Sequence, residues 1–148
     1  MSPGRVDVLR VRRLLLNLDV VLTRLKPHAG KEAAFLVANS DERWAVERGL
    51  QLCTQCVLDI ATHLVAAAGR DAPDYASAIV ALGELNIISR DFAGQLRPLA
   101  GLRNALVHGY LELDVDRLHS VLNLHLNDVR QFARAVDEFV ARQEAAKP

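Results

Sequence analysis

A short segment without carboxylates carries the residue types needed for acid–base chemistry on a phosphate ester. Residues 92–110 contain two arginines, Arg97 and Arg103, and one histidine, His108, but no aspartate or glutamate. A histidine titrates near neutral pH and can take or give a proton, and an arginine stabilises negative charge on a phosphorane. The pair therefore indicates phosphoryl-transfer chemistry. The competing interpretation is a histidine that ends a helix and an arginine in a salt bridge.

Helical geometry places several of these residues together. At about 100° per residue, one helix face carries a set of polar or small residues: Arg97, Gly101, Asn104 and His108. A glycine on this face permits another backbone or a substrate to approach closely. Arg103 lies about 140° around the helix from His108, so its long side chain would reach toward the histidine across a cleft or toward a neighbouring subunit.

A second polar pattern lies in an otherwise apolar stretch. Residues 49–69 contain a single formal charge, Asp59, which indicates a mostly buried helix. Polar residues nevertheless follow one another at steps of three and four: Arg48, Gln51, Gln55, Asp59 and then Thr62 or His63. Buried polar groups are costly unless they are paired. We therefore expect either a functional partner for this stripe, a structural hydrogen-bond network, or a strip that reaches solvent.

The elements that must position these residues are helices, because apolar residues recur at helical spacing and no segment alternates with period two. The expected helices are these: Val11 to Leu25, ended by Pro27; about Asp41 to Ala68, closed by Gly69; a short helix opened by Asp71 and Pro73; Ser89 to His108, interrupted at Pro98 and stopped by Gly109; and a last one from Asp114 or Asp116 past Phe139. We expect an all-α, up-and-down bundle of four main helices plus a short helix, in a single domain spanning residues 1–148.

Bulk composition narrows the function classes. The chain has 18 Lys and Arg against 18 Asp and Glu, and this zero net charge argues against a protein that coats nucleic acid or anionic membranes. Residues 1–13 do not read as a signal peptide, and residues 49–69 are too polar for a membrane span. Two cysteines provide no disulfide framework. We expect a cytoplasmic protein without membrane association.

One motif resembles a known family. Arg103-Asn-Ala-Leu-Val-His108-Gly-Tyr110 resembles the R-x4-H-x-Y signature of HepT-like toxins, in the HEPN superfamily of ribonucleases. Residues 47–64 and 124–132 resemble the second and final helices of that family. Two departures are Leu102, where the family often has an aromatic residue, and Pro98 within the helix. The resemblance implies a HEPN-like bundle and a metal-independent endoribonuclease toxin that acts on RNA as a homodimer, without a cofactor.

The resemblance also implies roles for individual residues. Arg103 would orient the scissile phosphate and His108 would act as general acid or base on the 2′-hydroxyl or the leaving oxygen. Asn104 and Asp59 would support this pair. Tyr110 would be the tyrosine that a cognate nucleotidyltransferase antitoxin modifies with AMP, which blocks the site. We expect no metal ligands.

Arginines outside the motif offer further candidates for RNA contacts. Arg97 and Arg48 are possible RNA-binding residues. Residues 1–26 carry six Lys and Arg against two Asp, and the arginines of this first helix, Arg10, Arg12, Arg13 and Arg24, would guide an RNA backbone. A solvated basic face is the simpler interpretation of that helix.

Other readings remain open. One alternative function is a non-catalytic helical partner that binds substrate or nucleotide for a small nucleotidyltransferase. Another is a structural dimerisation bundle. Cys53 and Cys56 match a CxxC pattern but fall in mid-helix, which favours two small core residues over a redox or zinc site. Trp44 is interpreted as a buried anchor rather than as a platform for a base.

Overall fold

The protein is almost entirely helical. The computed structural model describes residues 4–108 and 114–146, and no strand occurs within these ranges. The helices are α1 (Val8–Leu25), the 3-10 helix η1 (Lys26–His28), α2 (Ala33–Ala38), α3 (Ser40–Ala67), α4 (Tyr75–Glu84), α5 (Arg90–Leu96), α6 (Leu99–Val107), α8 (Val115–Leu124) and α9 (Leu126–Ala145). This confirms the predicted all-α bundle. Its four main helical legs are α1, α3, α5 with α6, and α8 with α9, and α4 is the short helix.

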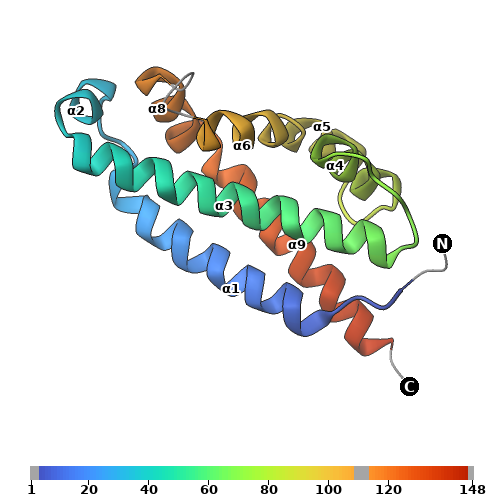
Figure 1. Ribbon diagram of the computed structural model, residues 1–148. Coiled ribbons are helices and arrows are strands. Elements are labelled where there is room, and N and C mark those ends of the chain that lie inside the picture. Colours follow the sequence, from blue (N-terminus) through green and yellow to red (C-terminus); the bar gives the residue numbers. More distant parts are fainter. Residues whose placement is uncertain (1–3, 109–113, 147–148) are drawn as a thin grey trace.

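Helix α3 is the centre of the bundle. It lies beside α1 and packs on α4 and α6 on another side, with α9 behind it (Figure 1). Apolar side chains on all of these helices form one buried cluster, in which Phe132, Leu58 and Ile60 are fully enclosed. This central position explains why α3 is long and weakly charged, since most of its circumference is covered by other helices.

Several helix ends agree with the sequence. Helix α1 stops at Leu25, two residues before Pro27, and α3 ends just before Gly69, whose φ of 77° closes the helix. Ser89 caps α5 by accepting a hydrogen bond from the Phe92 amide. The predicted interruption at Pro98 is confirmed, because α5 ends at Leu96 and α6 begins at Leu99.

The predicted start of the short helix is wrong by one turn. Asp74, rather than Asp71, is the N-cap of α4, and its carboxylate accepts a hydrogen bond from the Ser77 amide at 2.7 Å. A helix opened by Asp71 would place Ala72 in helical geometry directly before Pro73. The proline ring disfavours that conformation for the preceding residue.

The predicted last helix is two helices, and α2 was not expected. Helix α8 ends at Leu124 and α9 begins at Leu126. Just before the break, the Asn123 side-chain oxygen Oδ1 accepts a hydrogen bond from the Gly30 amide at 2.7 Å, while its side-chain nitrogen donates to the His119 backbone carbonyl. A tertiary contact to a distant loop accompanies the break, and the apolar periodicity of this segment gives no sign of it.

Helix α3 matches its predicted bounds within one residue at each end, but it is more apolar than the sequence estimate allowed. By length and composition alone, Ser40–Ala67 is capable of crossing a membrane, which corrects the expectation that this region is too polar. In the folded chain 56% of its most apolar window is buried against the other helices. The apolar surface of α3 is therefore accounted for by the protein core.

Candidate active site

The side chain of Arg103 is held between α3 and α4. It is half-buried, and its Nε donates a hydrogen bond to the Gln55 side-chain oxygen at 3.2 Å. Its guanidinium carbon lies 5.7 Å from the centroid of the Tyr75 ring, at the start of α4. A hydrogen bond at Nε together with an aromatic face fixes the plane of the guanidinium. Arg103 is thus an oriented cation without a carboxylate partner among the described residues.

Gln55 is itself fixed by a second set of contacts. Its side-chain nitrogen donates to Asp59 at 2.8 Å and lies 3.4 Å from the Tyr75 hydroxyl. Because the nitrogen is committed to the Asp59 carboxylate, the amide oxygen must face Arg103. Asp59 is therefore linked to Arg103 through Gln55 rather than by a direct hydrogen bond.

The exposed face of α6 carries the remaining motif residues. Gly101 and Asn104 on α6 and its C-cap His108 are exposed, and so is Arg97, which caps the end of α5 and is separated from α6 by Pro98. Asn104 accepts a hydrogen bond from Arg103 Nη1 at 3.3 Å, so the asparagine touches the arginine directly. A Cβ atom at Gly101 would meet no described atom within 4 Å outside its own stretch of helix. This face is open to a substrate or to a second molecule.

His108 directly follows α6 as its C-cap and is the last described residue before residue 114. Its backbone amide donates to the Asn104 carbonyl at 3.0 Å, and its side chain is exposed. No hydrogen bond links His108 to Arg103 among the described residues, in keeping with their separation around the helix. The predicted helix stop at Gly109 and the candidate modification site Tyr110 both lie outside the described residues.

The two candidate RNA-binding arginines occupy different places. Arg97 is exposed near the start of α4, where hydrogen bonds from Ser77, helped by the Arg97 charge, lower the pKa of Asp74. Arg48 is exposed on α3 and donates to Gln51 at 3.3 Å, one end of the predicted polar stripe. Arg12, by contrast, is paired with Glu144 and Asp137 on α9.

Sequence reasoning identified part of this site and missed part of it. Gln55 was recognised as a member of the polar stripe, but its contact with Arg103 was not predicted. Tyr75 was missed altogether, since nothing in the sequence marks the first residue of a short helix as a neighbour of α6. Spacing on one helix reveals a shared face, whereas this network joins three helices.

The other flagged features are structural or exposed. Cys53 and Cys56 are buried, as core residues were predicted to be, and burial raises the pKa of the Cys53 thiol to about 12. In the described part of the chain, no three His, Cys, Asp or Glu residues cluster as a metal site would require. The prediction that Trp44 is a buried anchor is wrong, because its side chain is 65% exposed.

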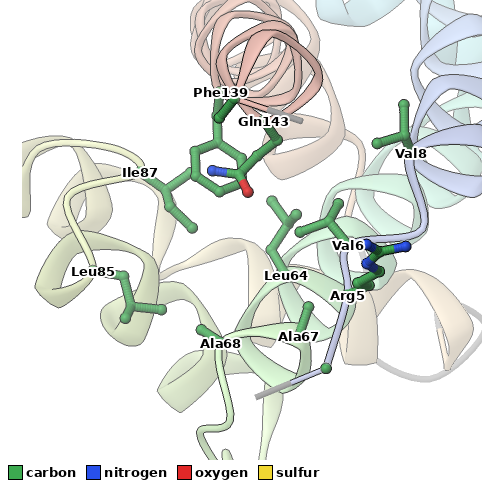
Figure 2. A pocket seen from close by; sticks show the side chains of 12 residues that line it. Arg5, Val6, Val8, Leu64, Ala67, Ala68, Leu85, Ile87, Phe139 and Gln143 are labelled. Carbon is green, nitrogen blue, oxygen red and sulfur yellow. The ribbon is translucent and has the colours of Figure 1, made fainter. Parts of the chain in front are cut away.

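A pocket near the end of α3 is separate from this site. It has a volume of about 500 Å³, and Figure 2 shows Phe139 and Gln143 facing Leu64 across it. Most of its lining is aliphatic, and none of the predicted site residues contributes to it. The chemistry-bearing groups therefore lie on the α3–α4–α6 surface rather than in this cavity.

Comparison with known proteins identifies related sequences. The family model "Ribonuclease HepT-like" matches residues 18–136. The chain is 27% identical over 110 residues to the tRNA nuclease HepT of Aphanizomenon flos-aquae, covering 73% of this chain and 74% of that protein. It is 33% identical over 84 residues to the mRNA nuclease HepT of Shewanella oneidensis, covering 56% of this chain and 63% of the relative.

Solved structures share the fold. The cytosolic protein of unknown function YutE from Bacillus subtilis superposes with a TM-score of 0.83 at 17% identity, over 98% of each chain. A tri-AMPylated HEPN toxin from Shewanella oneidensis, in complex with its MNT antitoxin, superposes with a TM-score of 0.78 at 23% identity. That match covers 89% of this chain and 98% of the toxin.

Proposed function

Because this chain belongs to the HepT-like ribonuclease family, we propose that it is a metal-independent endoribonuclease toxin controlled by a cognate nucleotidyltransferase antitoxin. We further propose that it works in the cytoplasm as a homodimer, with Arg103 and His108 at the cleft between subunits. The observation that carries this proposal is the Arg103 guanidinium, fixed by Gln55 and Tyr75 beside an open helix face that ends in His108.

The proposed reaction needs only these side chains and the RNA. Arg103 binds the scissile phosphate and stabilises the charge that develops on its oxygens. His108 either takes the proton of the 2′-hydroxyl, whose oxygen then attacks phosphorus, or gives a proton to the leaving 5′ oxygen as its bond to phosphorus breaks. Two copies in a dimer supply two histidines, so both proton transfers have a group available.

Gln55 should affect turnover through Arg103. We expect Gln55→Leu to lower kcat about tenfold with little change in KM, because it removes a hydrogen bond that orients a charged group without removing the charge. Steady-state cleavage of a fluorogenic RNA measures both parameters. Thr62→Val is the matched control, since Thr62 lies on the same helix stripe but, among the described residues, its hydroxyl bonds only to the Leu58 carbonyl. An equal loss in both variants, or a purely KM effect, would contradict this role.

Tyr110 should be the site of inhibition. It follows His108 by two residues, so an adenylyl group on its hydroxyl would bring negative charge next to the proposed phosphate site. We expect mass spectrometry after co-expression with the nucleotidyltransferase to find AMP on Tyr110, together with loss of RNA cleavage. Tyr110→Phe should remain active in the presence of the transferase. Inhibition of that variant, or modification confined to Tyr75, would overturn this assignment.

A further inference from the structure

A groove between α1 and α3 has the chemistry of a phosphate-binding surface. It has a volume of about 530 Å³ and is lined by Arg24 of α1, Arg48 of α3 and His28, together with Asn17 and aliphatic side chains. None of the described residues that line it is aspartate or glutamate. The carboxylate of Glu42 is bonded to His28 and to Lys31, so its negative charge is shared with these two groups and is not paired with Arg24 or Arg48.

The groove is formed by a close approach of its two helices. A Cβ atom at Gly49 would lie 2.6 Å from Leu25 Cδ2, so a larger residue there would have to displace the Leu25 side chain. Val20, at the rim, is 49% exposed. The groove thus has an apolar floor and two exposed arginines on opposite helices, a combination suited to a chain of phosphates joined by flat apolar bases.

One face of α3 connects this groove to the proposed active site. Trp44, Arg48 and Gln55 are spaced by four and seven residues, which places them within about 40° of one another around the helix axis. They span about 16 Å along α3, and Gln55 at the far end binds Arg103. The exposed Trp44 ring offers a stacking surface, Arg48 a phosphate contact, and Gln55 leads directly to the candidate catalytic arginine.

We propose that this surface, from Trp44 and Arg24 through Arg48 to Arg103, is a track that binds a single-stranded segment of the RNA substrate. This inference rests on the proposed ribonuclease function and specifies how the substrate is held. A base stacks on Trp44, and the phosphates that follow it contact Arg24 and Arg48. The track leads the strand along α3 to the site where it is cut, so a neutral protein binds RNA locally rather than over its whole surface.

The sole tryptophan of the chain makes the track directly observable. A labelled single-stranded RNA of mixed sequence is titrated into the His108→Ala protein, which keeps the track but should not cut. Anisotropy of the label reports binding, and intrinsic fluorescence reports the Trp44 environment. We expect Trp44 fluorescence to be quenched in step with binding. Binding without quenching would overturn the stacking contact.

The salt dependence of binding tests the arginines. We expect the double variant Arg24→Gln, Arg48→Gln to reduce the slope of log affinity against log salt concentration by about 1.4, since each lost phosphate contact on single-stranded nucleic acid contributes about 0.7. The control is Arg134→Gln, Arg142→Gln, which makes the same change in net charge on exposed positions of α9. An unchanged slope, or an equal change in both double variants, would contradict the track.

Two further outcomes separate this inference from its premise. Wild-type protein that neither binds nor cuts RNA would refute the proposed function and the track together. If the wild-type protein cuts RNA but the Arg24→Gln, Arg48→Gln variant has the same salt slope as the wild type, the track alone is refuted. The groove could instead hold a second copy of the chain, and light scattering on the Arg24→Gln, Arg48→Gln variant tests this. If the substitutions convert a dimer to a monomer, the groove is a subunit interface and the RNA proposal is overturned.

Discussion

Replacing His108 with alanine should lower RNA cleavage about 100- to 10,000-fold, the range that a positioned general acid or base contributes. His108 is exposed at the end of α6, so its replacement removes a proton-transfer group without opening a cavity in the core. Its backbone amide still bonds to Asn104, and we therefore expect the melting temperature to stay close to that of the wild type. Initial rates of cleavage and growth of cells that express the variant measure the effect.

A second histidine provides the control for this experiment. His125 is also exposed and sits at the junction of α8 and α9, where its ring lies 3.5 Å from Asp128. His125→Ala makes the same chemical change at a residue that has no hydrogen bond to Arg103, Gln55 or Asn104 among the described residues, and it should leave cleavage and growth inhibition intact. Persistent cleavage by His108→Ala, or an equal loss in His125→Ala, would remove His108 from the proposed mechanism.

Replacing Arg103 with alanine should lower cleavage about 100- to 1,000-fold, as expected when a preorganised donor to a developing negative charge is lost. Arg103→Lys should recover only a small part of this loss. Lysine keeps the charge, but it lacks both the Nε that donates to Gln55 and the planar group that lies over Tyr75. Single-turnover kinetics with saturating protein isolates this effect from substrate binding.

Arg97 offers a comparison on the same helical leg. It is exposed, and within the described chain it has no counterpart to the Gln55 and Tyr75 contacts of Arg103. Arg97→Ala should therefore raise KM with little change in the single-turnover rate. Equal losses from Arg97→Ala and Arg103→Ala under saturating conditions would show that the oriented guanidinium has no special part in the reaction.

The sequence predicted those parts of the fold that local chemistry determines. Apolar spacing and the residues Pro27, Gly69 and Pro98 placed the ends or interruptions of three main helical legs, because a proline or a left-handed glycine acts on the backbone where it stands. The break before α9 was missed, since Asn123 ties this segment to Gly30, a residue far away in the sequence. Contacts of that kind leave no periodic signal.

The candidate site was predictable to a similar degree. Helical spacing placed Asn104 and His108 on one face, and the structure shows both side chains exposed there. The partners of Arg103 depend on how α3, α4 and α6 pack, so Tyr75 was not foreseen. Trp44 was misassigned because a lone tryptophan is usually enclosed by its neighbours, whereas here it lies in the first turns of α3, where 65% of it stays exposed.

The most direct test of the central claim is RNA cleavage by purified protein in excess chelator. A mechanism that uses only Arg103 and His108 needs no metal ion, so we predict that EDTA leaves the wild-type rate unchanged, while the Arg103→Ala, His108→Ala double variant is inactive under the same conditions. Cleavage that stops on chelation and returns with added divalent metal would contradict the account. A wild-type chain that binds its nucleotidyltransferase but cuts no RNA would also contradict the account. That result would favour the alternative function, a non-catalytic partner of the transferase.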